Sequence, residues 1–182
     1  MSRVRGFIRL VRDGPRGSAL LVVLLAVLLH VLPGLFAPCA QARERQRPSI
    51  EELETETLEL VNEHRRSERL PPLDYSRPIA AIARRHSEAM AAGRFPVGHE
   101  GFEKRRRRIA RSIPLEGMAE NVGVNTDAAR RTAAMTVSGW LGSSGHRENI
   151  EGDYDATGIG IARSPRGAWY FTQIFVKRRK AP

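Results

Sequence analysis

The chain has 182 residues, of which 41% are hydrophobic, so it holds material for one domain with a core and little more. Its 30 lysine and arginine residues outnumber 20 aspartate and glutamate residues, which gives a net charge of +10. Much of this excess lies in the first 18 residues, so the remainder is only moderately basic. That charge favours anionic surfaces without singling out nucleic acid, and we expect no nucleic-acid partner.

Residues 1–42 are typical of an export signal. An arginine-rich start precedes the apolar run Ala19–Leu29, which is shorter than the ~20 residues of a membrane-spanning helix. Small residues at Ala40 and Ala42 have the spacing that a signal peptidase accepts. We therefore predict cleavage near Ala42 and a secreted or periplasmic location, with an uncleaved N-terminal membrane anchor as the alternative. The single cysteine, Cys39, precedes the cleavage point, so the mature protein would contain no disulfide.

Residues 43–48 are predicted to be a charged linker, followed by one domain over 49–178 and a tail over 179–182. Ser49 and Glu52 have the spacing of a capping box, and a helix is predicted from there until the prolines that follow Leu70. A second helix is predicted from Ser76 to Gly93. His86 lies on its apolar stripe, where a core histidine bonded to backbone is favoured over a ligand.

The segment after the second helix has a looser pattern. His99 lies in a predicted loop, and residues 104–108 form a run of five cations. A solvated helix face is the favoured interpretation of this run, and a contact with an anionic polymer is the alternative. Met118–Val124 is predicted to be a strand, within which Glu120 needs a partner, because desolvating an unpaired carboxylate costs several kcal/mol.

The last third of the chain combines a helix with a β-hairpin. The third helix is predicted to end near Trp140, because glycines at 142 and 145 interrupt it. His146–Ile150 is predicted to be a short polar turn. Two strand-like runs, Thr157–Ala162 and Ala168–Val176, follow it and are separated by a hairpin loop. We expect the core to contain Trp140, Ile159, Ile161, Trp169, Phe171 and Ile174.

Three polar residues stand out as a candidate site: His99, Glu120 and His146. Two imidazoles and one carboxylate form a workable ligand set for a divalent ion such as zinc, with positions left for water. A hydrogen-bonded polar cluster is the alternative, since sequence spacing does not decide between them. We predict that the three side chains converge, and that one histidine beside the carboxylate has a pKa above the usual value of about 6.5.

Several short motifs follow one another in order after Ile50. They are Leu60–Arg65, Leu70–Leu73, His86-Ser87, the loop ending in His99, Ala119–Val122, Trp140 with Ser144–Ile150, Thr157–Gly160 and Tyr170–Gln173. The ordered set resembles the CAP superfamily (cysteine-rich secretory proteins, antigen 5 and pathogenesis-related proteins), also called the SCP domain, in its disulfide-free bacterial form. The resemblance implies an α+β fold, a three-layer α-β-α sandwich with a small, mostly antiparallel sheet.

The resemblance also implies a central cleft, which in the family is usually lined by two histidines and two glutamates and in some members binds a divalent metal. By motif, His99 and Glu120 match one histidine and one glutamate. Ser143 stands where the second glutamate usually lies, Tyr170 stands where the second histidine usually lies, and His146 belongs to the bacterial pattern. These five residues are the expected cleft. The metal ligands, if zinc or a similar ion binds, are expected to be His99, Glu120 and His146.

Two functions are compatible with this sequence. The favoured one is an exported, monomeric binding module whose polar cleft holds a small ligand, a peptide or a cell-envelope component. The alternative is a metal-assisted hydrolase with His146 or His99 as general base. Binding is favoured because the family that the chain resembles has no settled common reaction. A serine hydrolase is disfavoured, because Ser143 and Ser144 lack the flanking glycines of a nucleophile elbow.

Overall fold

The computed structural model describes residues 47–179, and the predicted signal peptide over residues 1–42 lies outside this range. The helices are α2 (Ile50–Ser67), α3 (Arg77–Ala91), α4 (Phe102–Ala110), α5 (Ala129–Leu141) and α6 (Ser144–Glu151). The strands are β1 (Asp74–Tyr75), β2 (Leu115–Asn125), β3 (Ala156–Arg163) and β4 (Trp169–Arg178). Within the described range, no helix is both long and apolar enough to cross a bilayer.

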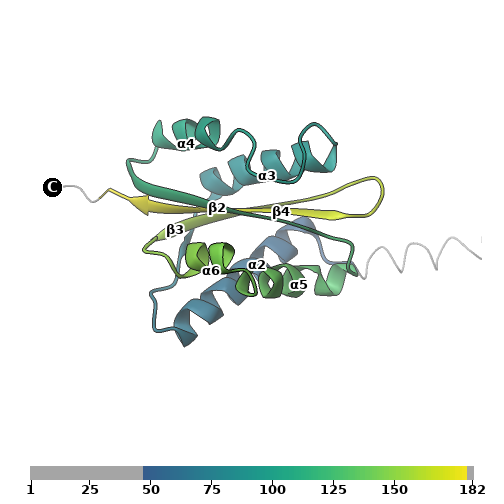
Figure 1. Ribbon diagram of the computed structural model, residues 1–182, viewed down its shortest axis with the longest axis horizontal. Helices are drawn as coiled ribbons and strands as arrows, with labels where there is room; N and C mark the ends of the chain where they lie inside the picture. Colours follow the sequence, from purple (N-terminus) through teal and green to yellow (C-terminus); the bar gives the residue numbers. More distant parts are fainter. Residues whose placement is uncertain (1–46, 180–182) are drawn as a thin grey trace, which may run out of the picture. The chain divides into compact units, whose positions relative to one another are not determined.

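The described strands form one mixed sheet between two helical layers (Figure 1). The strand order is β1-β3-β4-β2, in which β1 pairs with β3 in parallel and the other two pairings are antiparallel. Helices α3 and α4 cover one face, while α2, α5 and α6 cover the other (Figure 1). The predicted α+β class, the three layers and the mostly antiparallel sheet are therefore confirmed.

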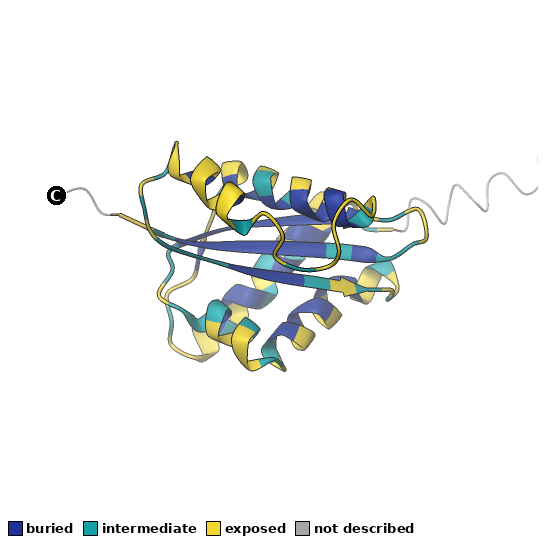
Figure 2. Cartoon of the chain, turned by 45° about the horizontal axis from the view of Figure 1, so that its top comes forward, coloured by how far each residue is buried: buried dark blue, intermediate teal, exposed yellow. Residues whose placement is uncertain are grey.

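The core divides between the two faces of the sheet. On the α2, α5 and α6 face, Trp140, Phe171 and their neighbours form one buried cluster, and on the α3 and α4 face Ile174 packs with Ile79 and Ile109. The central strands are buried along most of their length (Figure 2). All of the predicted core residues are buried, namely Trp140, Ile159, Ile161, Trp169, Phe171 and Ile174.

One element was predicted incorrectly. His146–Ile150 is not a turn, because it lies within the helix α6. The glycine at 142 ends α5 as expected, but Ser143 then adopts an extended conformation (φ −107°, ψ 123°) and a new helix begins one residue later. The glycine-rich break is therefore too short to form a loop, and Gly145 is tolerated inside the first turn of α6.

Helix α3 packs directly on the backbone of β3. A Cβ atom added at Gly158 would lie 2.2 Å from the Ala80 nitrogen, and one added at Gly160 would lie 1.9 Å from the Arg84 nitrogen. Both contacts are far below van der Waals distance, so only glycine fits at either position. The Thr157–Gly160 motif is thus the surface on which α3 rests.

The outer edge of β3 is partly closed by a buried carboxylate. Strand β1 is only two residues long and pairs with Ala156 and Thr157, which leaves the rest of the edge without a neighbouring strand. Glu54 from α2 accepts a hydrogen bond from the Ile161 amide at 3.1 Å. The Arg84 guanidinium donates to both oxygens of the same carboxylate, which compensates its charge.

Candidate functional site

Glu120 is the buried centre of the polar site. Its side chain is 1% exposed and projects from β2 toward α4, where Arg105 donates two hydrogen bonds to its carboxylate at 2.6 and 2.7 Å. His99 donates a third from Nδ1 at 3.0 Å. The bidentate guanidinium contact is the strong form of this pairing and supplies the donors that a buried carboxylate needs. Glu120 was predicted to need a partner, and that partner is mainly Arg105, with His99 beside it.

Arg105 is the residue that sequence reasoning missed. It lies inside the run of cations over residues 104–108, and it is 9% exposed although a solvated face was favoured for the whole run. Phe102, Arg105 and Ile109 follow one another at steps of three and four, so they share one face of α4. The apolar residues at both ends of this series were the signal that the middle position faces inward.

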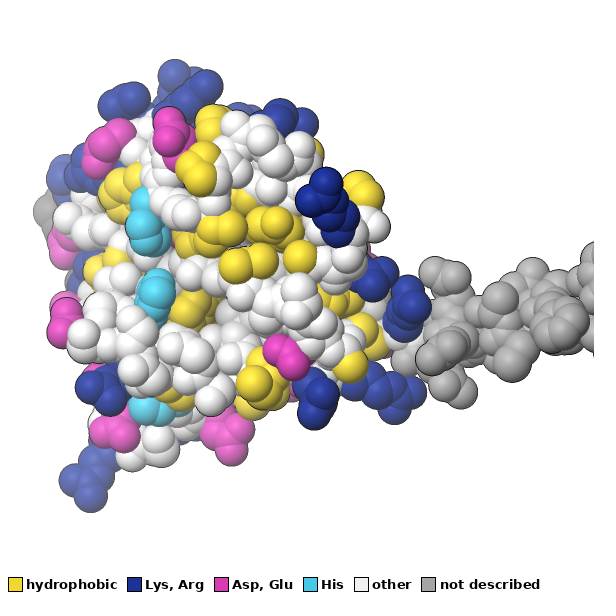
Figure 3. All heavy atoms as spheres, turned by 45° about the vertical axis from the view of Figure 1, so that its right-hand side comes forward, with side chains coloured by type: hydrophobic (Ala, Val, Ile, Leu, Met, Phe, Trp, Pro, Cys, Tyr) yellow, Lys and Arg dark blue, Asp and Glu magenta, His cyan; other side chains and the backbone are white. Residues whose placement is uncertain are grey.

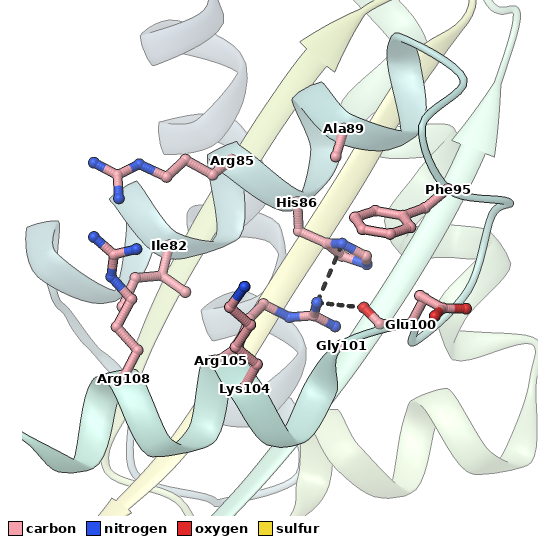
Figure 4. A pocket seen from close by; sticks show the side chains of 10 residues that line it. All are labelled: Ile82, Arg85, His86, Ala89, Phe95, Glu100, Gly101, Lys104, Arg105 and Arg108. Carbon is pink, nitrogen blue, oxygen red and sulfur yellow. Dashed lines mark hydrogen bonds between the residues drawn. The ribbon is translucent and has the colours of Figure 1, made fainter.

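Arg105 also fixes the loop that carries His99. Its Nη1 donates to the Glu100 carbonyl at 2.6 Å and to His86 Nδ1 at 3.2 Å (Figure 4). His86 in turn contacts the Gly98 carbonyl through Nε2 at 2.8 Å. A carbonyl only accepts and a guanidinium only donates, so Nε2 carries the hydrogen and the ring is neutral. The prediction that His86 is a core histidine bonded to backbone is confirmed.

Burial lowers the pKa of His86 below its usual value, and the nearby Arg105 charge acts in the same direction. The unfolded chain then binds more protons than the folded protein between the folded pKa and about 6.5, so stability rises with pH in that window. We expect the free energy of unfolding to fall as the pH drops below about 6.5. Urea titrations at several pH values should show a smaller decrease for His86→Gln. An equal decrease in that variant would contradict this assignment.

His146 reaches the same edge of the sheet from the opposite helical layer. Asn121 on β2 donates from Nδ2 to the His146 carbonyl at 2.9 Å, and Asn149 Nδ2 donates to Asn121 Oδ1 at 2.9 Å. These bonds join α6 to β2 directly beside Glu120. The pKa of His146 is lowered by burial and by the positive charge that His99 can carry. The rise that was predicted for a histidine beside the carboxylate is therefore not found at His146.

A groove of about 380 Å³ runs along the open edge of β2. One wall is the stretch Val122–Asn125, the other is the face of α5 with Met135, Gly139 and Trp140, and the α6 end carries Ser143 and His146. Figure 3 shows hydrophobic side chains gathered on one face of the described domain, with histidine side chains beside them. The groove and the His99–Glu120 pair together make the candidate site.

Comparison with known proteins assigns the family. A family model described as the cysteine-rich secretory protein family, CAP, matches residues 58–175. The chain belongs to the CAP family.

Individual proteins match this chain at 29% identity or less. The uncharacterized membrane protein YlbC of Bacillus subtilis is 29% identical over 147 residues, which are 79% of this chain and 40% of that protein. An outer surface protein of Borrelia burgdorferi superposes with a TM-score of 0.62 at 19% identity, covering 74% of this chain and 98% of that one. An extracellular SCP-domain protein of Bacillus anthracis gives 0.57 at 23% identity, covering 70% and 42%. This chain therefore spans less than half the length of YlbC.

The divalent metal of some CAP proteins does not fit the residues present in this arrangement. Within residues 47–179, no three His, Cys, Asp or Glu side chains lie close enough together to hold an ion. Both oxygens of Glu120 are already bonded to Arg105, whose fixed positive charge would also repel a cation. The expected three-residue metal site of His99, Glu120 and His146 is thus not assembled.

Tyr170, the other CAP position expected in the cleft, lies on β4 opposite Val124. It is half-buried and is not among the residues that line the groove. Ser143, by contrast, lines the groove together with His146. The cleft is therefore built from β2, α5 and α6, and Tyr170 stands behind its edge strand.

A second pocket, of about 180 Å³, lies between α3 and α4 on the other side of Arg105 (Figure 4). Ile82, Ala89 and Phe95 provide its apolar lining, and Arg85, Lys104 and Arg108 carry their charges at its rim. Apart from Arg105, the other members of the run over residues 104–108 are exposed. The predicted solvated face is therefore correct for every position of the run except the one that binds Glu120.

Proposed function

We propose that this protein is an exported CAP-family binding module whose cleft holds a small ligand, a peptide or a cell-envelope component without transforming it. The observation that carries this proposal is the burial and hydrogen bonding of the Glu120 carboxylate. Its carboxylate is buried and both of its oxygens accept hydrogen bonds from Arg105 or His99, so neither oxygen is free for use as a general base or a metal ligand. The accessible polar groups beside it are the exposed ring of His99 and those that line the groove.

The surroundings of the groove favour binding because they are held rigidly. Trp140 donates to the Val122 carbonyl at 3.1 Å, and Asn149 contacts the Glu120 carbonyl at 3.4 Å. Exposed apolar surface lies beside these fixed polar groups, since Val124 is 45% exposed and Met135 is 49% exposed. Apolar walls with a few placed polar groups are the usual composition of a ligand site.

Export is supported by the N-terminal pattern of residues 1–42 and by two structural relatives whose descriptions place them at the outer surface or outside the cell. We expect the protein to be recovered outside the cytoplasm with its new N-terminus near Arg43. An intact-mass measurement decides between cleavage and retention. A species that keeps residues 1–42 in the membrane fraction would establish an anchor instead.

The binding proposal is tested with soluble peptidoglycan fragments and a mixture of short peptides as probes. We expect the ring resonances of His99 and His146 to shift on addition of one of these probes, and the mass of that probe to stay unchanged. Met135→Lys places a charge in the groove and should weaken the response, whereas Val97→Lys, at an exposed loop position, should not. If neither probe moves the resonances, the binding proposal is wrong.

A hydrolase without metal is the second candidate, and the geometry of His99 favours it. Its ring is 54% exposed, and its Nδ1 is held by Glu120, so Nε2 is oriented toward solvent as in a base positioned by a carboxylate. Shortened probe molecules after incubation would support this function. His99→Gln would then abolish product formation while the far-UV circular dichroism spectrum stayed unchanged.

A further inference from the structure

The outer edge of β2 presents unpaired main-chain groups to the groove. In an antiparallel ladder, successive residues turn their N–H and C=O groups alternately toward the partner strand and away from it. The carbonyls of Glu120 and Val122 accept side-chain donors from α6 and α5, so these residues face away from β4. By the same alternation, the Val122 N–H and both main-chain groups of Val124 face outward. In the described sheet, β2 has a neighbour on one side only.

The groove beside this edge has open space next to α5. Helix α5 runs along it as a second wall, and the two walls meet where Gly123 packs against Thr136 and Trp140. A Cβ atom added at Gly139 would meet no atom within 4 Å, so the space above it is open. An edge strand that is flanked by a helix accepts an extended segment whose alternate side chains enter the space between them.

The chemistry of the groove differs from that of the surrounding surface. No lysine or arginine lines it in the described part of the chain, and Asp127 is its one carboxylate. Val124 and Met135 contribute exposed apolar side chains. The pocket between α3 and α4, by comparison, has arginine and lysine at its rim. The groove therefore complements a ligand that is neutral or basic and has apolar side chains.

We propose that the groove binds an extended, uncharged or basic peptide with alternating apolar side chains, which adds to the edge of β2 as a further strand. This proposal rests on the proposed function and names its ligand class. Only a polypeptide repeats N–H and C=O groups at the spacing of Val122 and Val124. A second copy of this chain fits less well through its β3 edge, because Glu54 already accepts a hydrogen bond from the Ile161 amide there.

The test uses the full chain and a displayed library of random short peptides, from which the best binder is synthesised. Gly139→Leu places a side chain in the groove, where its Cβ meets no atom within 4 Å, and we expect it to lower the affinity by at least about tenfold. Gly145→Leu is the matched control, since its Cβ also meets nothing within 4 Å and it lies outside the groove lining. Its affinity should equal that of the wild type. Equal binding by both variants would overturn the proposed site.

A second measurement reads the main-chain pairing itself. N-methylation of the peptide should abolish binding at alternate positions only, because only every second N–H faces β2. If methylation changed the affinity at none of the positions, strand addition would be wrong. A library that yields no binder, or a groove-dependent dimer in sedimentation equilibrium, would overturn the peptide class. The shift of the histidine resonances with peptidoglycan fragments would still support the broader binding function in that event.

Discussion

Replacing Gly160 with alanine is expected to lower the free energy of unfolding by about 3 kcal/mol or more. The added Cβ would lie 1.9 Å from the Arg84 nitrogen and 2.3 Å from its Cα, so backbone of α3 rather than a mobile side chain must move. Arg84 also binds Glu54, which holds the Ile161 amide, so a displaced α3 disturbs the buried edge of β3 as well. Urea titration of the purified variant measures this loss.

Gly139→Ala is the matched control for this experiment. Its Cβ meets no atom within 4 Å, and the residue lies inside α5. Alanine restricts the unfolded chain and favours the helix, so this variant should be as stable as the wild type or more stable by about 0.5–1 kcal/mol. If Gly160→Ala were equally stable, the direct packing of α3 on β3 would be wrong.

Replacing Arg105 with methionine is expected to destabilise the protein by about 3–5 kcal/mol. Methionine keeps part of the side-chain volume, but it leaves the Glu120 carboxylate buried with His99 as its remaining donor. It also removes the hydrogen bonds that hold the Glu100 carbonyl and the Nδ1 atom of His86. The loss should therefore appear in denaturant titration and as faster amide exchange in the loop around His99.

Two further variants separate the effect of the unpaired buried charge from the effect of removing any cation of α4. The double variant Arg105→Met with Glu120→Gln removes the uncompensated charge, so it should be more stable than Arg105→Met alone. Arg106→Met changes the next cation on α4, which is exposed and lies 3.9 Å from Glu103, and it should alter stability by less than about 0.5 kcal/mol. Similar losses for Arg105→Met and Arg106→Met would contradict the role given to Arg105.

Local patterns were sufficient to predict most of the fold. The proline pair after Leu70, the glycine at 93 and the alternating runs after residue 157 each act on their own backbone, so their effects are visible in sequence. Strand β1 was not predicted, because its two residues exist as a strand only through pairing with Ala156 and Thr157. Helix α6 was missed because two glycines in four residues also fit a loop, and packing of the buried Ile150 in the core favours the helix.

The candidate site was less accessible to sequence reasoning, because its partners come from different elements. His99 and Glu120 were predicted to meet, and they do so across 21 positions of sequence. The residue that binds Glu120 most strongly was hidden in a run of cations, since charge alone does not distinguish the inward position from its neighbours. Tyr170 was expected in the cleft by its place in a motif, but it lies on β4 and is not among the residues that line the groove.

The carboxylate of Glu54 limits how one molecule can join another through the edges of its sheet. By occupying the Ile161 amide beside the short β1, it closes part of one side of the described sheet, while the β2 side stays open. A fibre grows by strand addition only when each molecule offers two open sides, one for each neighbour. A sheet that is open on one side joins a single extra strand and then stops. The domain can therefore keep this edge exposed without polymerising through it.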